Sequence, residues 1–407
     1  MTPRGMKPIR ETLPIDEARA LVFAALAPVT RVERVALSQA GGRVSATDIV
    51  CAVDVPPFNR AGMDGYAVIA EDTFGAGRYD PRILRVVETI YTGETPAKTI
   101  ASGQCAEIAT GAPMPDGANA VVMVEETERA GDQVRVFTPV YPNQHVGRRG
   151  ADLAAGDVAV ARGMLLTPAR VGALAAAGIS SVDVYAKPRV AILSTGNEVA
   201  EPGDPLPPGH IYDINRYTLE AITREHGGEP GARPAAPDTM AELTEALTRA
   251  AADADIVVFS GGSSVGERDL ILDVIEARGE VVFHGIAVKP GKPTVFGRVD
   301  GKPILGMPGY PTSCLSNAYM LLVPMLRVMA HLPPWRAQIV SVPLTRRIVS
   351  TTGRHQFYTV RIRDGQAEPA FKASGDITSM AAADGYIEIP AQTDVVEAGE
   401  IVDVRLF

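Results

Sequence analysis

The chain has 407 residues, more than one hydrophobic core usually spans, which predicts roughly two to four domains. Hydrophobic residues make up 46% of the chain and charged residues 21%, which indicates a globular protein. The formal net charge is −9 and no basic run is present, which argues against a nucleic-acid partner.

The cysteines and the hydropathy pattern argue against disulfide-rich, zinc-binding, secreted and membrane-spanning proteins. The three cysteines are widely spaced, and an odd number without a Cys-x-x-Cys pair argues against a disulfide framework and a zinc site. The N-terminus is polar and contains prolines, so no signal peptide is expected. The most apolar stretch, residues 319–329, contains Pro324 and Arg327 and is too short to span a bilayer. We therefore expect a soluble, cytoplasmic protein with no membrane partner.

The first part of the chain combines a helix with many short strands. Residues 14–27 read as an amphipathic helix and residues 31–37 as a strand. Between residues 51 and 144, short β-like runs are separated by Gly, Pro, Asp and Asn, which predicts a small all-β module. The expected strands are residues 66–69, 83–87, 105–108, 120–124 and 133–137.

The sequence pattern changes again after this module. Residues 151–185 return to small apolar residues, with a helix opening at Thr167-Pro168, so the module is expected to be inserted between two halves of one domain. Within the module, Asp64-Gly65 and Asp116-Gly117 read as ordinary turn dipeptides.

From residue 187 the pattern becomes α/β. Residues 189–193 read as a strand, and Asp238-Thr239 caps a helix that continues to residue 252. A long apolar helix is expected to end at Ala330. Strands that alternate with helices predict a parallel sheet, in which ligands bind beyond the carboxyl ends of the strands.

The segment from Asp255 to Arg278 is the most informative part of this region. Residues 255–260 are typical of a buried parallel strand, and residues 270–278 have apolar residues at helical spacing. The glycine-rich turn between them has free N–H groups that can hold an anion. Glu267 and Asp269 lie at the same turn, and acids beside an anion site indicate a cation or a proton transfer. A plain strand-to-helix connection is the alternative.

Other loops of this kind occur in the same region. Residues 194–198 and 306–313 also follow expected strands and carry Gly with Ser, Thr or Pro, and a further loop carries Lys289 and Lys292. Together they predict a polar cleft with phosphate-sized sites, two lysines and two carboxylates. Because Gly-x-Gly-x-x-Gly and Gly-x-x-x-x-Gly-Lys-Ser are absent, neither a dinucleotide-binding fold nor a P-loop NTPase is indicated.

The end of the chain returns to alternating strands. Residues 357–363 lead into the hairpin turn Asp364-Gly365, and residues 402–406 form the last strand. This predicts a β domain of about 70 residues, a size that usually depends on a neighbour for stability. Arg354 and Ser374 lie in its loops, where surface turn residues are the simpler interpretation.

Several motifs, taken together, resemble those of the MoeA family, the molybdopterin molybdenumtransferases, which also occur as the E domains of gephyrin and of plant fusion proteins. The resemblance covers nearly the whole chain. The motifs are Ala-Gly-Met-Asp64-Gly-Tyr-Ala, Thr110-Gly-Ala-Pro-Met-Pro, Ser194-Thr-Gly-Asn-Glu198, Ser260-Gly-Gly-Ser-Ser-Val-Gly-Glu-Arg-Asp269, Lys289-Pro-Gly-Lys292-Pro and Met307-Pro-Gly-Tyr-Pro.

The resemblance implies a multidomain α/β plus β fold. Its parts are an elongated N-terminal dimerisation domain (1–50 with 145–186), an inserted small β module (51–144), a parallel-sheet molybdopterin-binding domain (187–331) and a small C-terminal β domain (332–407). It also implies a homodimer whose site lies between the α/β domain of one subunit and the β module of the other.

The implied activity belongs to molybdenum cofactor biosynthesis. The enzyme would take adenylylated molybdopterin and molybdate, cleave the pyrophosphate link with Mg²⁺, release AMP and leave molybdenum on the dithiolene sulfurs. A molybdopterin adenylyltransferase would act upstream. Two alternatives are that the chain is itself that adenylyltransferase, which needs the α/β domain alone, or a non-enzymatic molybdopterin-binding scaffold. The sequence does not separate molybdate from tungstate as the substrate.

The resemblance also assigns site residues position by position. Glu198 and Asp269 are expected to bind Mg²⁺, and Lys289 and Lys292 to concentrate molybdate. The expected catalytic residues are Asp64, Thr110, Asp152, Glu198, Asp238 and Asp269. The residues expected to bind the substrates are Ser194, Thr195, Gly196, Gly261, Gly262, Ser263, Ser264, Gly266, Lys289, Lys292, Pro308, Gly309, Pro311, Ser313, Arg354 and Ser374.

The chain departs from the family pattern at a few positions near these motifs. Gly147 stands where the family usually has Arg, and Ala151 stands in place of Glu. Tyr310 replaces a common Asn, and Thr359 replaces a frequent Arg. The sequence does not show what these replacements change.

Overall fold

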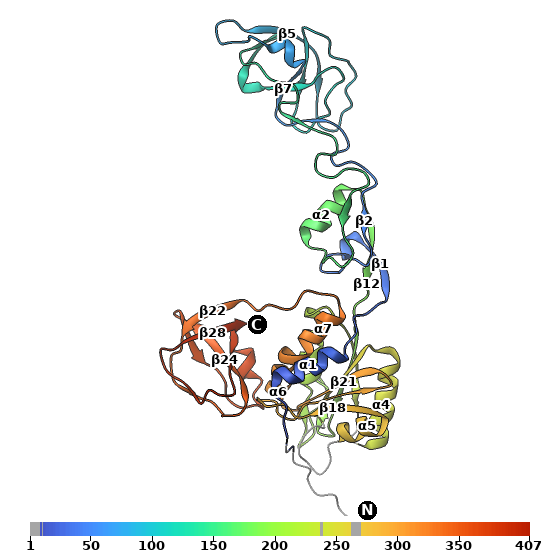
Figure 1. Cartoon of the computed structure of the whole chain (residues 1–407), viewed down its shortest axis with the longest axis vertical. Coiled ribbons are helices and arrows are strands. Elements are labelled where there is room, and N and C mark those ends of the chain that lie inside the picture. The colour runs from blue at the N-terminus through green and yellow to red at the C-terminus, as the bar shows by residue number, and fades with distance from the viewer. Residues whose placement is uncertain (1–8, 10, 237–238, 262–269) are drawn as a thin grey trace, which may run out of the picture. The chain divides into compact units, whose positions relative to one another are not determined.

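The computed structural model describes residues 9, 11–236, 239–261 and 270–407. The chain forms two compact units, Met1–Glu33 with Tyr185–Phe407, and Arg34–Val184 (Figure 1). It leaves the first unit along β1 (Val32–Ala36) and returns along β12 (Ser181–Tyr185), and these two strands pair. In the described ranges, none of the helices combines the length and the apolar character needed to cross a membrane.

The unit Arg34–Val184 contains a β-sheet with the strand order β7-β4-β6-β5-β9-β8. Side chains of β4 alternate between its faces, so Tyr66 and Val68 enter one core and Ala67 enters another. All the strands expected here are present, and β8 is an addition. The bounds are β4 (Gly65–Val68), β5 (Arg82–Ile90), β6 (Gln104–Ile108), β7 (Ala120–Met123), β8 (Thr127–Ala130) and β9 (Gln133–Val136).

The rest of this unit is built from short paired strands and one α-helix, α2 (Pro168–Ala176), among the described residues. The Thr167 side chain caps this helix by accepting a hydrogen bond from the Arg170 N–H, as the sequence predicts. Leu166 and Leu174 pack in a core with strand β12. The paired strands are β2 (Ile49–Val50) with β11 (Val158–Val160), and β3 (Arg60–Ala61) with β10 (Val146–Gly147).

The other unit contains a mixed sheet with the order β16-β13-β17-β21-β20-β18. The expected parallel arrangement holds for the first four strands and is wrong for β20, which runs antiparallel to both neighbours. The two-residue turn Asp300-Gly301 joins β20 to β21 as a hairpin, so no crossover helix separates them. The bounds are β13 (Arg189–Thr195), β16 (Glu229–Ala236), β17 (Ile256–Ser260), β18 (Gly279–His284), β20 (Val295–Val299) and β21 (Lys302–Met307).

The reversed strand decides where the two lysines lie. Val295, at the start of β20, pairs with Gly306 near the end of β21, and His284, at the end of β18, pairs with Val295. The loop from β18 to β20, residues 285–294, therefore lies at the edge where the parallel strands end. We call this segment the lysine loop, because it carries Lys289 and Lys292.

Helices cover both faces of this sheet (Figure 1). Ile256 and Val258 of β17 face a core shared with α1, α3, α6 and α7, whereas Val257 and Phe259 face a core shared with α4 and α5. This alternation explains the continuous apolar run in the sequence. The bounds are α1 (Ile15–Ala25), α3 (Asn215–Glu225), α4 (Met240–Asp253), α5 (Leu270–Arg278), α6 (Pro311–Asn317) and α7 (Val323–Met329).

The long apolar helix expected before Ala330 is interrupted. A π-helical turn, Ala318–Leu322, separates α6 from α7. Pro324 has no N–H to donate to the Met320 carbonyl, and that carbonyl instead accepts a hydrogen bond of 3.1 Å from Arg19 Nε on α1. The interruption thus ties α1 to the helices on this face.

The C-terminal part forms a second sheet in the same unit, with the order β19-β24-β26-β28-β22. Strand β19 comes from the lysine loop and pairs in parallel with β24, so this loop joins the two sheets. Asp364 and Gly365 form the expected hairpin turn, both with positive φ. The bounds are β19 (Val288–Lys289), β22 (Ile339–Pro343), β24 (His355–Arg363), β25 (Gln366–Pro369), α8 (Thr378–Ala381), β26 (Gly385–Ile389) and β28 (Ile401–Leu406).

Candidate active site

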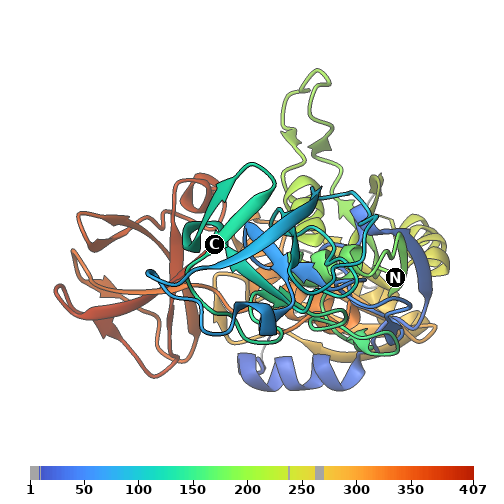
Figure 2. The same ribbon diagram turned by 90° about the horizontal axis from the view of Figure 1, so that it is seen from above.

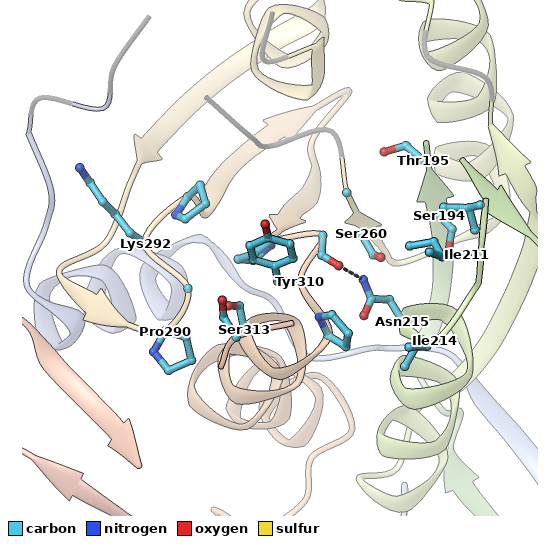
Figure 3. A pocket seen from close by; sticks show the side chains of 18 of the residues that line it. Ser194, Thr195, Ile211, Ile214, Asn215, Ser260, Pro290, Lys292, Tyr310 and Ser313 are labelled. Carbon is cyan, nitrogen blue, oxygen red and sulfur yellow. Dashed lines mark hydrogen bonds between the residues drawn. The ribbon is translucent and has the colours of Figure 1, made fainter. Parts of the chain in front are cut away.

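A cavity of about 690 Å³ opens at the carboxyl edge of the mixed sheet (Figure 3). Its walls are the loops after β13, β17 and β21, the lysine loop, and two loops of the C-terminal sheet, all within one unit. The predicted site residues that line it are Ser194, Thr195, Glu198, Gly261, Lys289, Lys292, Pro308, Gly309, Pro311, Ser313, Arg354 and Ser374.

Close backbone packing shapes the wall where the strands end. A Cβ atom on Gly261 would lie 2.6 Å from the Thr195 carbonyl oxygen, and Gly261 has a φ of +97°. A Cβ atom on Gly309 would lie 3.4 Å from the Gly261 Cα. Gly261 is therefore required both for its conformation and for the contact between the loops after β13 and β17.

Unsatisfied polar side chains lie beside this wall. Ser194 Oγ, Thr195 Oγ1 and Asn215 Oδ1 are buried and have no hydrogen-bond partner in the described part of the chain. Asn215 Nδ2 donates to the Gly309 carbonyl at 2.8 Å, which fixes its Oδ1 as a free acceptor. Because a buried polar atom without a partner is costly, these atoms are suited to pair with a bound polar ligand.

Asn215 and Asp213 line the cavity but are not among the residues that the sequence singles out. Both belong to the run Tyr212-Asp213-Ile-Asn215, which follows a proline-rich loop and leads into α3. This short polar run between a loop and an apolar helix is the feature that could have indicated them.

Cationic side chains surround one end of the cavity. Lys289 Nζ donates to Thr351 Oγ1 at 2.7 Å, and Lys292 Nζ donates to the Ile9 carbonyl at 2.9 Å. In Figure 3, Lys292 points away from the cluster formed by Ser194, Thr195 and Asn215. Neither lysine forms an ion pair with a described residue, and each ammonium group keeps further N–H donors for an anion. Arg354 adds a third positive charge to the lining.

Glu198 supplies a carboxylate at another part of the wall. A Cβ atom on Gly196 would lie 2.8 Å from both carboxylate oxygens of Glu198, so the glycine makes room for this side chain. Gly196 itself is buried and is not a lining residue. Within the described ranges, nothing hydrogen-bonds or ion-pairs with the Glu198 carboxylate, which leaves its oxygens open to a ligand.

A projecting loop borders the cavity between β14 (Val199–Ala200) and β15 (Ile211–Tyr212) (Figure 2). Arg216 on α3 holds its base, because its guanidinium group contacts the carboxylates of Glu201 and Asp213. The Tyr217 hydroxyl and Arg216 both donate to Glu201 and hold the pKa of that carboxyl below its usual range. The projecting loop is thus anchored to α3 by charge.

Asp64, Thr110 and Asp152 belong to the other unit. Asp64 Oδ1 accepts hydrogen bonds from the Thr110 N–H at 2.6 Å and from the Thr110 hydroxyl at 2.9 Å. These bonds, the backbone one first, lower the pKa of Asp64. Two turns that look ordinary in the sequence therefore meet through hydrogen bonds from Thr110 to the Asp64 carboxylate. Asp152 adjoins the bridge between Val55 and Leu153, and its N–H donates to the Val55 carbonyl.

The departures from the family pattern have different surroundings. A Cβ atom on Gly147 would lie 3.2 Å from Arg60 Cγ, so the missing side chain lets Arg60 lie across β10. Tyr310 lines the cavity and is 66% exposed. Thr359 is fully buried, and its hydroxyl has no partner in the described ranges. Nothing in the structure explains the change at Ala151.

Several predicted site residues lie outside the described residues, so the structure gives no account of them. They are Asp238, Gly262, Ser263, Ser264, Gly266 and Asp269. Among the residues that are described, no group of three or more His, Cys, Asp or Glu side chains is placed to enclose a metal ion.

The donors present nevertheless fit Mg²⁺, a hard cation that prefers oxygen ligands. It is usually held by one or two carboxylates together with waters and substrate phosphates. The open Glu198 carboxylate supplies a ligand of this kind beside the cavity.

Comparison with known families matches almost the whole chain. The family description "MoeA N-terminal region (domain I and II)" matches residues 13–178. "Probable molybdopterin binding domain" matches residues 191–328, and "MoeA C-terminal region (domain IV)" matches residues 341–407.

Individual relatives agree with this match over their full length. The chain is 38% identical to "Molybdopterin molybdenumtransferase 2" of Mycobacterium tuberculosis, over 95% of this chain and 96% of the relative. It is 33% identical to "Molybdopterin molybdenumtransferase" of Haemophilus influenzae, over 97% and 98%. The solved structure of a molybdopterin biosynthesis MoeA protein from Pyrococcus horikoshii is 40% identical, covers 97% of this chain and 99% of its own, and has a TM-score of 0.84.

Proposed function

Because this chain belongs to the MoeA family, we propose that it is a molybdopterin molybdenumtransferase of molybdenum cofactor biosynthesis. It takes adenylylated molybdopterin and molybdate, cleaves the pyrophosphate link by addition of water, releases AMP and leaves molybdenum on the dithiolene sulfurs. The observation that carries this proposal is the cavity at the carboxyl edge of the sheet. It combines cations, a carboxylate and buried polar atoms that have no charged or polar partners among the described residues, apart from the hydrogen bonds of the two lysines.

The cationic end of the cavity is the proposed molybdate site. Molybdate is a dianion, and Lys289, Lys292 and Arg354 present positive charge there without ion pairs to described residues. Ser313 and Ser374 add hydroxyl groups to the same lining. Ser374 is fixed to the start of α6, because its carbonyl accepts a hydrogen bond of 3.1 Å from the Thr312 N–H.

The polar wall is the proposed site for the adenylylated substrate. Ser194 and Thr195 supply hydroxyl groups, and Asn215 supplies an acceptor whose direction is fixed by its bond to Gly309. These groups would bind and orient the phosphates and rings of the substrate. The assigned residues Gly262, Ser263, Ser264 and Gly266 would extend this site with backbone N–H groups.

Magnesium is part of the proposal. When bound, Mg²⁺ would neutralise charge on the pyrophosphate that is cleaved. Glu198 would hold it through the carboxylate that Gly196 makes room for, and Asp269 is the second proposed ligand. Asp64, Thr110, Asp152 and Asp238 are the other proposed catalytic residues. The hydrogen bonds from Thr110 would keep Asp64 ionised at the pH of the reaction.

We propose domain boundaries, an oligomeric state and partners together with this activity. The domain boundaries are proposed at residues 1–50 with 145–186, 51–144, 187–331 and 332–407. The mixed sheet falls within 187–331, whereas β19 of that range pairs with β24 of the last range. We also propose a cytoplasmic homodimer, with a molybdopterin adenylyltransferase as the upstream enzyme and small molecules as the substrates.

The proposal is tested by AMP release from purified protein given adenylylated molybdopterin and Mg²⁺, with and without molybdate. Molybdate-dependent AMP release with molybdenum bound to the product is expected. A second reaction contains ATP and molybdopterin only, and no adenylylated product is expected from it. Formation of that product would instead identify an adenylyltransferase, and binding of molybdopterin without turnover in either reaction would identify a scaffold.

A further inference from the structure

The lysine loop is held at both ends by strand-like contacts. Near its start, the Leu13 N–H donates to the Gly285 carbonyl at 3.1 Å, and the Ala287 N–H donates to the Leu13 carbonyl at 2.7 Å. Its next residues form β19, which pairs with β24 of the C-terminal sheet. Two backbone bonds close the loop around the turn that follows: the Gly285 N–H donates to the Thr294 carbonyl at 2.7 Å, and the Ile286 N–H donates to the Lys292 carbonyl at 3.1 Å. Inside the turn, between Lys289 and Lys292, side chains hold the Gly291 carbonyl.

A buried polar triangle holds this turn from below. Asn317 Nδ2 donates to the Gly291 carbonyl at 2.9 Å and to Thr294 Oγ1 at 2.6 Å. Thr294 Oγ1 donates in turn to the same Gly291 carbonyl at 2.9 Å. Asn317 and Thr294 have no exposed surface. Both amide hydrogens of Asn317 are thus used on the lysine loop and none on its own helix.

The backbone of the turn is shaped to fit this amide. Gly291 has a φ of +107°, and a Cβ atom there would lie 2.4 Å from Asn317 Oδ1. The side-chain amide therefore lies flat against the glycine. Figure 3 shows Pro290 and Lys292 on the loop, next to the helix that carries Ser313. The contact is between the lysine loop and α6, the helix that also lines the cavity.

A side-chain amide at position 317 lowers the stability of the folded protein. The residues three before, one after and four after it in the chain, Cys314, Ala318 and Leu321, belong to the apolar core, and its Oδ1 has no partner in the described part of the chain. A buried polar atom without a partner destabilises the folded state, so an apolar side chain would suit the core better. The amide offsets this cost by forming two hydrogen bonds to the lysine loop.

We infer that Asn317 is a positioning residue for the oxyanion substrate. Through Gly291 and Thr294 it fixes the turn that aims Lys289 and Lys292, and it does not itself contact the substrate. This inference rests on the proposed function, since it takes the two lysines as the groups that bind molybdate. Loss of the amide leaves both lysines in the chain but lets the turn between them move.

Two variants test this role, Asn317→Ala and the isosteric Thr294→Val, with Thr223→Val as the matched control. Thr223 is buried in the same unit and its hydroxyl has no partner in the described ranges, so its loss removes a buried polar group away from the lysine loop. Each variant is assayed for the dependence of AMP release on molybdate concentration. Amide hydrogen exchange of residues 286–294 is measured in parallel.

We expect the KM for molybdate to rise about tenfold in Asn317→Ala, the effect of losing two buried hydrogen bonds. The rise should be smaller in Thr294→Val, which keeps the bond from Asn317 to the Gly291 carbonyl. The kcat at saturating molybdate should stay within about twofold of wild type, because the reacting groups are unchanged. Exchange should become faster in residues 286–294 and stay unchanged in β13 and β17. The control should match wild type in both measurements.

An unchanged molybdate KM in the folded variants, or a fall in kcat with KM unaltered, would overturn the inference. If Asn317→Ala does not fold, Thr294→Val decides the question alone, because it removes both hydrogen bonds of the Thr294 hydroxyl and keeps the shape of the side chain. Failure of the proposed function is recognised separately, since wild-type protein would then release no AMP in response to molybdate. The exchange measurement still shows in that case whether Asn317 holds the loop, and unchanged exchange would refute it.

Discussion

At the scale of single residues, the lysine side chains of the cavity are hydrogen-bonded to residues that are distant in the sequence. Thr351, in the loop before β24, orients Lys289, and the carbonyl of Ile9 orients Lys292. Neither partner is an acid, so each lysine keeps its charge available while its direction is restricted. This combination suits a site that has to attract an oxyanion and then let it react.

Replacing Lys292 by Ala is expected to raise the molybdate concentration needed for half-maximal activity by about 10- to 100-fold, the effect of losing one charged hydrogen bond. The reaction at saturating molybdate should be much less affected. Lys302→Ala is the control, because Lys302 begins β21 at the end away from the cavity. An equal effect in both variants would show that overall charge, and not the position of Lys292, attracts molybdate.

Asp64 and Thr110 give a prediction about pH. Two hydrogen bonds from Thr110 stabilise the ionised carboxylate and lower its pKa, so Asp64 stays charged as the pH falls toward the ordinary range for aspartate. Thr110→Val removes the hydroxyl bond and raises this pKa. Activity at about pH 4, near the ordinary pKa of aspartate, should then fall more than activity at about pH 7.5. If the acid limb of the pH–rate profile is the same in the variant and in wild type, ionised Asp64 is not required for activity.

Some of these residues could be predicted from the sequence and others could not. Ser194, Glu198 and the lysines stand in Gly- and Pro-rich loops after apolar strands, a pattern visible without a structure. Asn215 acquires its role from Gly309, which lies 94 positions further along the chain. Asn317 likewise depends on Gly291 and Thr294. A polar side chain at the start or end of a helix does not reveal which distant carbonyl it will meet.

At the scale of secondary-structure elements, the positions of strands were predictable and the direction of one was not. The hairpin dipeptide Asp300-Gly301 is visible in the sequence and accounts for the reversed strand β20, but the alternation of strands and helices favoured a parallel arrangement. The interrupted apolar helix was also predictable only in part. Pro324 indicates a break, whereas the hydrogen bond from Arg19 to Met320 that accompanies it depends on packing with α1.

The end of α3 gives a prediction about stability. His226 is 2% exposed, packs edge-on against Trp335, and its ring nitrogens have no partners in the described ranges. Burial, with a smaller contribution from the charge of Arg327, lowers the pKa of His226 to about 4. The unfolded chain therefore binds this proton more readily than the folded protein, so stability is lost as the pH falls from about 6.5 toward 4.

His226→Leu should keep the stability of the protein at pH 7, because no hydrogen bond is lost. Between pH 7 and pH 5 the variant should lose about 2 kcal/mol less unfolding free energy than wild type. Urea unfolding at the two pH values measures this difference. Carboxylates add a loss of the same sign to both proteins, so the comparison between them isolates the histidine. Parallel losses in the two proteins would contradict a buried, neutral His226.

At the scale of the whole molecule, the residues proposed for catalysis are divided between the two compact units. Glu198 and the lysines belong to one unit, and Asp64 with Thr110 belongs to the other. A homodimer in which each site uses both subunits is the proposed arrangement. No pattern in a single sequence predicts contacts between two copies of a chain, because hydrophobic periodicity reports burial and not the identity of the partner.

Mixed dimers test this arrangement. Asp64→Asn and Glu198→Gln are each expected to be inactive alone, since each removes one charge while keeping the shape. Refolded or co-expressed mixtures should recover about half of the wild-type activity per mixed dimer, because one of its two proposed sites then carries no substitution. If the mixture stays as inactive as either variant, each site is built from a single subunit or the dimer does not form.

The central claim is that the cavity beside the lysine loop is where molybdate meets the adenylylated substrate. Its most direct test is a crystal of this protein soaked with molybdate and AMP, with anomalous diffraction recorded at the molybdenum edge. The account predicts one strong molybdenum peak in the cavity, in contact with Lys289, Lys292 or Arg354, and AMP against Ser194, Thr195 or Asn215. A molybdenum peak elsewhere on the protein, with the cavity empty of it, would contradict the account.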